Sequence, residues 1–301
     1  HSASFAVLAY VSSWLKYYYP QAFYVALLNS WPMGFYPPAQ LVQDAQRHQI
    51  QILPVCINAS DYEHKFEFHN NDWAIRLGFS LVKGLKETEL ISLLKHRPEQ
   101  GFEHVAQIKQ LGLARHYLEA LASANAFSCI SDNRYAARWS LMDNESDLPL
   151  FRHLAEPAAN YSESLVAIKK PSASETLIED YSSLSLTLGK HPIALLREAG
   201  LLPKHVQANQ LYQREHQKPL SVIGVVVGRQ RPGTSKGVTF ISLEDDTGCM
   251  NVIVWLATAR AQKQAYLKSK ILKVNGILER GDGGVTHIIA GKLEDLSHLI
   301  K

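Results

Sequence analysis

The order of predicted elements in residues 218–300 constrains the fold most. This segment predicts a strand, a basic glycine-containing loop, two strands, a helix over about 257–270 and two further strands. The predicted strands alternate apolar and polar residues or are rich in β-branched residues, and they span 220–227, 238–243, 250–255, 271–278 and 285–290. Such an order is typical of a five-stranded OB-fold β-barrel, which grips single-stranded nucleic acid or oligosaccharide across its second and third strands.

The charge of this segment favours a polyanionic partner. Residues 218–301 carry twelve Lys and Arg against seven Asp and Glu, whereas residues 1–217 carry nineteen against twenty-one. Arg229, Arg231 and Lys236 gather in the loop between the first two predicted strands, where contacts with phosphates would make binding depend on salt. A solvated loop that uses its basic residues only for solubility is the alternative.

Two aromatic residues and an acidic pair complete the segment. Phe240 is a candidate platform on which a base stacks, and ordinary packing is the alternative that the residues leave open. Trp255 is expected in the core. Asp245 and Asp246 precede Thr-Gly, a combination that indicates a hairpin turn and not a metal site.

Length and composition predict a soluble protein of two or three domains. The chain has 301 residues, of which 46% are hydrophobic and 20% charged. Cys56, Cys129 and Cys249 lie far apart in the sequence without metal-ligand spacing, so buried reduced thiols and a cytoplasmic location are expected. The apolar stretch 5–15 is too short to span a bilayer and predicts a core helix.

The N-terminal residues predict helices followed by two short strands. Apolar periodicity and prolines indicate helices over 3–18, 21–28 and 38–47, and strands over 50–55 and 61–68. His64 and His69 lack partners at ligand spacing, so exposed histidines without a metal are expected here.

Residues 77–94 have the outline of a helix-hairpin-helix. A short apolar helix turns at Lys83 and Gly84, and a second helix starts near Lys86, where such hairpins usually carry another glycine. A hairpin of this kind aims the backbone N–H groups of a helix start at a DNA phosphate. A related outline turns at Gly112, which predicts a tandem pair. Two packed helical hairpins without a ligand are the alternative.

Residues 146–217 predict a linker with short helices. Near its start, Leu148, Leu150 and Phe151 form an apolar anchor that suits a partner's pocket. A segment that closes over the protein's own core is the alternative.

Five stretches, in the same order along the chain, together resemble one family. They are SASFAVLAYVSSWLKYYYPQAFYVALLNS (2–30), ILPVCINASDY (52–62), AIRLGFSLVKGL (74–85), DYSSLSLTLGKHPIALL (180–196) and RQRPGTSKGVTFISLEDDTGCMNVIVW (229–255). With these motifs the chain resembles the C-terminal part of bacterial C-family DNA polymerases, closest to the error-prone branch, which serves damage-induced translesion synthesis.

The resemblance implies a multidomain α+β fold with four parts. These are the end of the polymerase fingers (1–68), a tandem helix-hairpin-helix region on duplex DNA (69–145), a linker (146–217) and an OB domain near the single-stranded template (218–301).

The resemblance also limits the expected activity. The family is a DNA-directed DNA polymerase, but it holds its two metal ions on aspartates of an upstream palm domain, and no such motif is present here. We therefore expect a non-catalytic piece of a longer protein, without a cofactor of its own, and Mg²⁺ in the full-length polymerase. An ending soon after the barrel favours the error-prone branch.

Partners and alternatives follow from the same resemblance. The motif at Leu148 to Phe151 falls where the replicative branch binds the sliding clamp, although Asp147 replaces the preferred glutamine. The expected partners are single-stranded and duplex DNA, with the clamp and accessory proteins of a mutagenesis complex. A stand-alone DNA-repair binding module and a protein-docking platform are the other functions that these residues allow.

Overall fold

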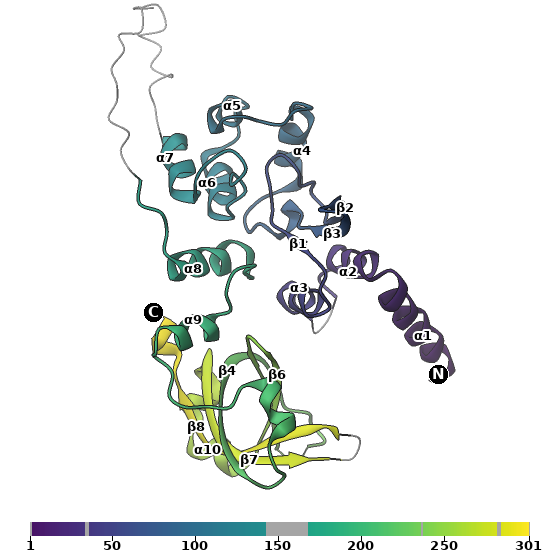
Figure 1. Ribbon diagram of the computed structural model, residues 1–301, viewed down its shortest axis with the longest axis vertical. Coiled ribbons are helices and arrows are strands. Elements are labelled where there is room, and N and C mark those ends of the chain that lie inside the picture. Colours follow the sequence, from purple (N-terminus) through teal and green to yellow (C-terminus); the bar gives the residue numbers. More distant parts are fainter. Residues whose placement is uncertain (1, 34–35, 143–167, 236, 282–283, 301) are drawn as a thin grey trace, which may run out of the picture. The chain divides into compact units, whose positions relative to one another are not determined.

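The chain forms two compact units, which we name the hairpin unit (His1–Leu188) and the barrel unit (Gly189–Lys301). The computed structural model describes residues 2–33, 36–142, 168–235, 237–281 and 284–300. The multidomain α+β prediction is confirmed, because a helical unit is followed by a closed five-stranded barrel (Figure 1). The predicted linker is divided, since its described residues up to 188 belong to the hairpin unit and the rest to the barrel unit. Among the described helices, none combines the length and hydropathy that crossing a bilayer requires.

The three predicted N-terminal helices are present. They are α1 (Ser2–Tyr18), α2 (Pro20–Asn29) and α3 (Pro38–Arg47), and prolines occupy the first turns of α2 and α3. The prediction that 5–15 forms a core helix is wrong for this chain. Phe5, Val7, Leu8 and Tyr10 of α1 are 60–72% exposed. Apolar periodicity predicts the helix itself, but burial also needs a surface that packs against it.

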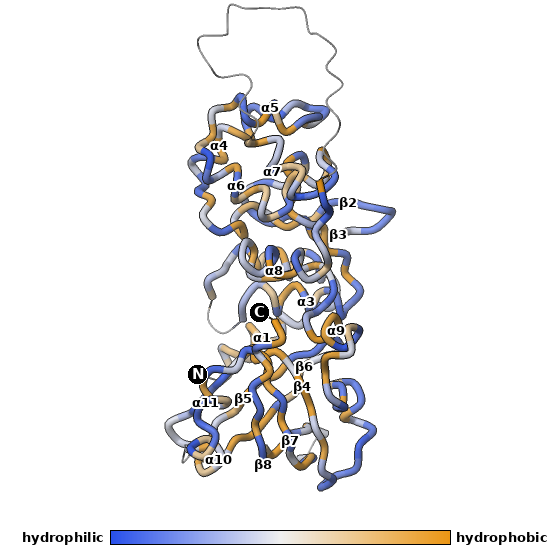
Figure 2. The backbone as a smooth tube through the Cα atoms, turned by 90° about the vertical axis from the view of Figure 1, so that its left-hand side faces the viewer, coloured by the Kyte–Doolittle hydropathy of each residue, from blue (hydrophilic) through white to orange (hydrophobic). Residues whose placement is uncertain are grey.

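A small sheet follows, in the order β1-β3-β2. Strand β1 (Ile52–Leu53) runs parallel to β3 (Asp72–Arg76), and β2 (Lys65–His69) pairs with β3 as a hairpin. Both predicted strands are shorter than expected, and β3 was not predicted, because it runs from exposed to buried residues without alternation. Figure 2 shows the β2–β3 hairpin projecting with a hydrophilic tip.

After the sheet, the described residues of the hairpin unit form five α-helices. They are α4 (Glu87–Lys95), α5 (Val105–Lys109), α6 (Arg115–Ser123), α7 (Arg134–Met142) and α8 (Ala173–Leu184). One continuous apolar core joins them to the sheet and to α2 and α3, with Phe79, Leu93, Ile108, Leu121 and Phe127 almost fully buried. This shared core fixes the helices and therefore the turns between them.

The barrel unit has OB-fold strand order. Strands β4 (Pro219–Gln230), β5 (Thr239–Asp245), β6 (Gly248–Val254), β7 (Ile271–Arg280) and β8 (Thr286–Asp295) close in the order β4-β5-β6-β8-β7. The barrel prediction is thus confirmed. The single helix predicted after β6 is instead two, α10 (Leu256–Ala261) and α11 (Lys263–Lys268). Helix α9 (Pro192–Glu198) belongs to this unit as well.

Candidate nucleic-acid interface

The first hairpin turns on Gly84. A short 3-10 helix (Phe79–Leu81) precedes the turn and α4 follows it. Gly84 has a φ of +80°, and a Cβ built there would meet nothing within 4 Å. The turn therefore needs glycine for its backbone conformation and presents that backbone on an open surface. The first N–H groups of any α-helix have no partner within the helix, and the side chain of the N-cap residue of α4, Lys86, does not supply one.

The two lysines that flank this turn differ in their contacts. The Lys83 backbone N–H donates to the carbonyl oxygen of Ser183 at 2.9 Å, and its Nζ donates to that of Tyr181 at 3.0 Å. Both acceptors lie near the C-terminal end of α8, which attracts a cation. Lys83 thus ties the turn to α8, whereas Lys86 is exposed at the start of α4.

The second hairpin repeats these features. Gly112 lies between α5 and α6, has a φ of +74°, and would also place a Cβ in open space. Helix α6 begins after Ala114, which makes no side-chain cap either. The two turns therefore share a left-handed glycine, an open surface and an uncapped helix start, which is the arrangement expected for a tandem pair.

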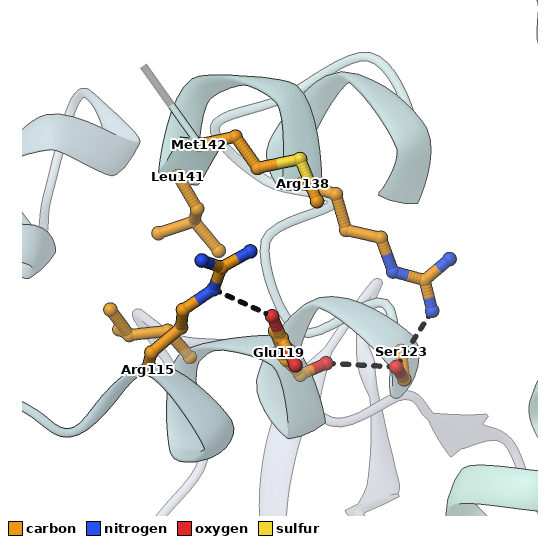
Figure 3. A pocket seen from close by; sticks show the side chains of 7 residues that line it. Arg115, Glu119, Ser123, Arg138, Leu141 and Met142 are labelled. Carbon is orange, nitrogen blue, oxygen red and sulfur yellow. Dashed lines mark hydrogen bonds and ion pairs between the residues drawn. The ribbon is translucent and has the colours of Figure 1, made fainter. Parts of the chain in front are cut away.

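A hollow of about 310 Å³ lies against α6 and α7, beside the second hairpin (Figure 3). Its arginines already face carboxylates. Arg115 Nε donates to Glu119 at 2.9 Å, and Arg138 donates to both oxygens of Glu179 at 2.9 and 2.6 Å. Arg138 also reaches Ser123 Oγ at 2.7 Å. Because these cations are balanced locally, the hollow offers little attraction for a phosphate.

In the barrel unit, the basic residues predicted to share one loop lie in different environments. Arg229 Nε donates to the carbonyl oxygen of Tyr266 at 2.9 Å, and Nη2 donates to that of Ser269. Both carbonyl groups lie at the C-terminal end of α11, so the guanidinium of Arg229 caps that helix. Burial lowers the pKa of Arg229. Arg231 is exposed. Lys236 lies outside the described residues.

Phe240 belongs to a row of side chains on the outer face of the barrel. Phe240 is 39% exposed and pairs with Ile253 on β6. Ile253 in turn pairs with Ile289 on β8, and Ile289 pairs with Ile277 on β7. Ile277 is 47% exposed. We name these four residues the outer row. It crosses β5 and β6, the strands on which OB-folds bind their ligands.

Trp255 lies on the surface of the barrel unit. It was predicted in the core but is 53% exposed, directly after β6. The signal was available, because Val252 and Val254 point into the barrel and a period of two puts the next residue outside. Trp255 thus adds an accessible aromatic ring to this unit.

The acidic pair has the predicted turn chemistry. Asp245 accepts from the N–H groups of Thr247 and Gly248 at 2.7 and 3.0 Å, and Asp246 forms a bidentate ion pair with Arg197. In the described part of the chain, no three His, Cys, Asp or Glu residues gather as a metal site.

Two further predictions concern other parts of the chain. His64 was expected to be exposed, but it is 5% exposed, and its Nδ1 accepts from the N–H of Gly78 at 3.1 Å. The side chain lies inward because it satisfies this buried backbone donor. The anchor formed by Leu148, Leu150 and Phe151 lies outside the described residues.

Comparisons with known proteins agree with this geometry. Residues 49–137 match the helix-hairpin-helix motif family, and residues 220–296 match the family of OB-fold nucleic acid binding domains. The chain is 57% identical over 299 residues to the error-prone DNA polymerase of Vibrio campbellii, covering 99% of this chain and 28% of that protein. It is 46% identical over 302 residues to the error-prone DNA polymerase of Hahella chejuensis, covering 99% and 29%.

The resemblance expected from the motifs is therefore confirmed, and the chain spans less than a third of the length of these relatives. Among solved structures, asparaginyl-tRNA synthetase from Pyrococcus horikoshii is 19% identical with a TM-score of 0.28, over 32% of this chain and 23% of that chain.

Proposed function

We propose that this chain, which is homologous over its whole length to part of the error-prone DNA polymerases, is the DNA-binding portion of such an enzyme. The hairpins contact duplex DNA, and the barrel contacts the single-stranded template during damage-induced translesion synthesis in the bacterial cytoplasm. The chain does not catalyse by itself, and Mg²⁺ acts at carboxylates elsewhere in the full-length polymerase. A sliding clamp and accessory proteins are further proposed partners, the clamp through Leu148, Leu150 and Phe151.

The pair of open glycine turns carries this proposal. Gly84 and Gly112 both adopt left-handed φ values, and a side chain at either would meet open space. Each turn is followed by a helix start without a side-chain cap. A duplex phosphate can therefore approach both backbones, where unpaired N–H groups and the helix dipole favour an anion.

A titration with duplex and single-stranded oligonucleotides at several salt concentrations tests the proposal. Lys86→Ala is expected to weaken duplex binding and to lower its salt slope by about 0.9, as one lost phosphate contact requires. Lys95→Ala is the matched control, since it removes an exposed lysine from the other end of α4. A salt-independent affinity would favour a protein-docking platform, and equal losses for both variants would contradict a specific phosphate contact at the start of α4. Primer extension by the full-length protein over a damaged template tests the translesion role.

A further inference from the structure

Two cysteines that are distant in sequence meet in the hairpin unit. Cys56 lies in the loop after β1 and Cys129 lies in the segment after α6, with their Sγ atoms 3.3 Å apart. The backbones are held together beside them, because the N–H of Ile57 donates to the carbonyl oxygen of Ala126 at 2.8 Å. A disulfide has an S–S distance of about 2.05 Å, so closing it needs only ~1.3 Å of further approach by the sulfur atoms.

The surroundings of the pair favour a thiolate on one sulfur. The hydrogen bond with Cys129 lowers the pKa of Cys56 to about 6 against the effect of burial, with help from the N–H groups of Asn58 and Ala59 and from the charge of Arg76. The same hydrogen bond raises the pKa of Cys129, so Cys129 keeps its proton when Cys56 has lost its own. The pair thus resembles a reactive dithiol, in which one sulfur is a nucleophile at neutral pH and the other resolves the product.

We propose that Cys56 and Cys129 form an oxidation site, at which a hydroperoxide converts the two thiols to an intramolecular disulfide. The Cys56 thiolate attacks one peroxide oxygen, so that an S–O bond forms, the O–O bond breaks and the leaving oxygen takes a proton. The Cys129 sulfur then attacks the sulfur of this sulfenic acid, releasing its proton to the departing hydroxide. The two thiols lose two electrons and two protons, and the hydroperoxide becomes an alcohol, or water, and one further water.

Access and chemistry both support this site. Cys129 is exposed and Cys56 keeps 9% of its surface exposed, so an oxidant that enters beside Cys129 reaches the Cys56 sulfur, 3.3 Å from that of Cys129. Among the described residues the pair has no third ligand that would make it a metal centre. Cys249 is also exposed, but it lies in the barrel unit with Glu244 3.8 Å from its Sγ. Cys249 therefore serves as an internal control for unselective oxidation.

Peptide mapping after treatment with hydrogen peroxide tests the proposal. The reduced chain is oxidised, the remaining thiols are alkylated, and the digest is analysed by mass spectrometry. The expected product is a cross-linked peptide joining Cys56 and Cys129, two hydrogens lighter than the reduced pair and restored by dithiothreitol, while Cys249 stays alkylated. Cys129→Ser should leave a sulfenic acid on Cys56 that dimedone traps, and Cys56→Ser should abolish both products.

Other products would overturn the assignment. Cross-links between two copies of the chain, or oxidation of Cys249 at the same rate as the pair, would show that the 3.3 Å approach confers no special reactivity. A second measurement does not depend on the variants. Oxidised unmodified chain should unfold at a higher urea concentration than reduced chain, because the bond closes a long loop in the unfolded state. An unchanged midpoint, with the thiols still free after treatment, would also reject the site.

Discussion

Arg229, near the end of β4, and Arg231, directly after it, provide the sharpest test of the interface. If Arg231 contacts one phosphate of a single strand, Arg231→Ala should lower the slope of log affinity against log salt by about 0.7. When the salt concentration rises from 50 to 200 mM, the ratio of the affinity of the unmodified chain to that of this variant should then decrease by about 2.6-fold. Arg229→Ala should leave the slope unchanged, because this guanidinium donates to the carbonyl oxygens of Tyr266 and Ser269.

The cost of losing Arg229 should appear in stability. Its two hydrogen bonds come from a charged donor, and such bonds contribute about 1.5–3 kcal/mol each where they are buried. Arg229 is partly exposed, which reduces this contribution, so we expect a loss of about 1–2 kcal/mol from the free energy of unfolding of the barrel unit. Arg231→Ala should not change that stability measurably.

Fluorescence anisotropy with a labelled single strand at four or more salt concentrations measures the slopes, and urea unfolding followed by circular dichroism measures stability. Lys204→Ala is a matched control, since it removes an exposed positive charge ahead of the barrel strands. Arg229 contacts phosphate and does not stabilise the barrel unit if Arg229→Ala flattens the salt slope as much as Arg231→Ala does, while its unfolding midpoint stays unchanged.

Three further outcomes follow from the same structure. Gly84→Ala should destabilise the hairpin unit by about 1–2 kcal/mol in urea unfolding, because Gly84 has a φ of +80°, which a residue with a Cβ rarely adopts. The space around Gly84 is open, so this cost comes from the backbone and not from a clash. Gly84→Asn should cost less, since Asn tolerates that conformation. Phe240→Ala and Trp255→Ala should each weaken single-strand binding in the anisotropy titration by about 1–3 kcal/mol if the ring stacks on a base, and unchanged affinity would assign that ring to the surface only. Burial lowers the pKa of His64 to about 4, so the unfolded chain binds more protons than the folded chain between pH 6.5 and 4. The free energy of unfolding should therefore decrease as the pH is lowered through that window, by about 1.4 kcal/mol at pH 5.5 relative to pH 8. Urea midpoints of His64→Gln should lack this dependence.

Local patterns predicted most of the fold. The barrel strands were predictable because a period of two is readable within each strand, as Ile241 and Leu243 inside and Phe240 outside show. The turns at Gly84 and Gly112 were predictable because glycine marks a left-handed backbone conformation. In each case a few neighbouring residues carried the whole signal.

The missing parts depend on contacts between distant residues. The role of Arg229 is set by Tyr266 and Ser269, which lie 37 and 40 residues further along the chain. The same applies to the sulfur contact across 73 residues between Cys56 and Cys129. A count of basic residues or thiols cannot show that a group already has a partner within the folded unit.

Under the proposed function, charge and geometry together predict different modes of DNA binding for the two units. The hairpin unit carries fifteen Lys and Arg against nineteen Asp and Glu, whereas the barrel unit carries sixteen against nine. On the proposed function, a unit with a net charge of −4 gains little from general attraction to a polyanion, so its contacts with DNA are expected to rest on the backbone N–H groups after Gly84 and Gly112. The barrel unit, at +7, is instead expected to gain affinity for a nucleic-acid strand through release of counterions. Raising the salt concentration should therefore weaken single-strand binding more steeply than duplex binding, and the opposite order would contradict this division of roles.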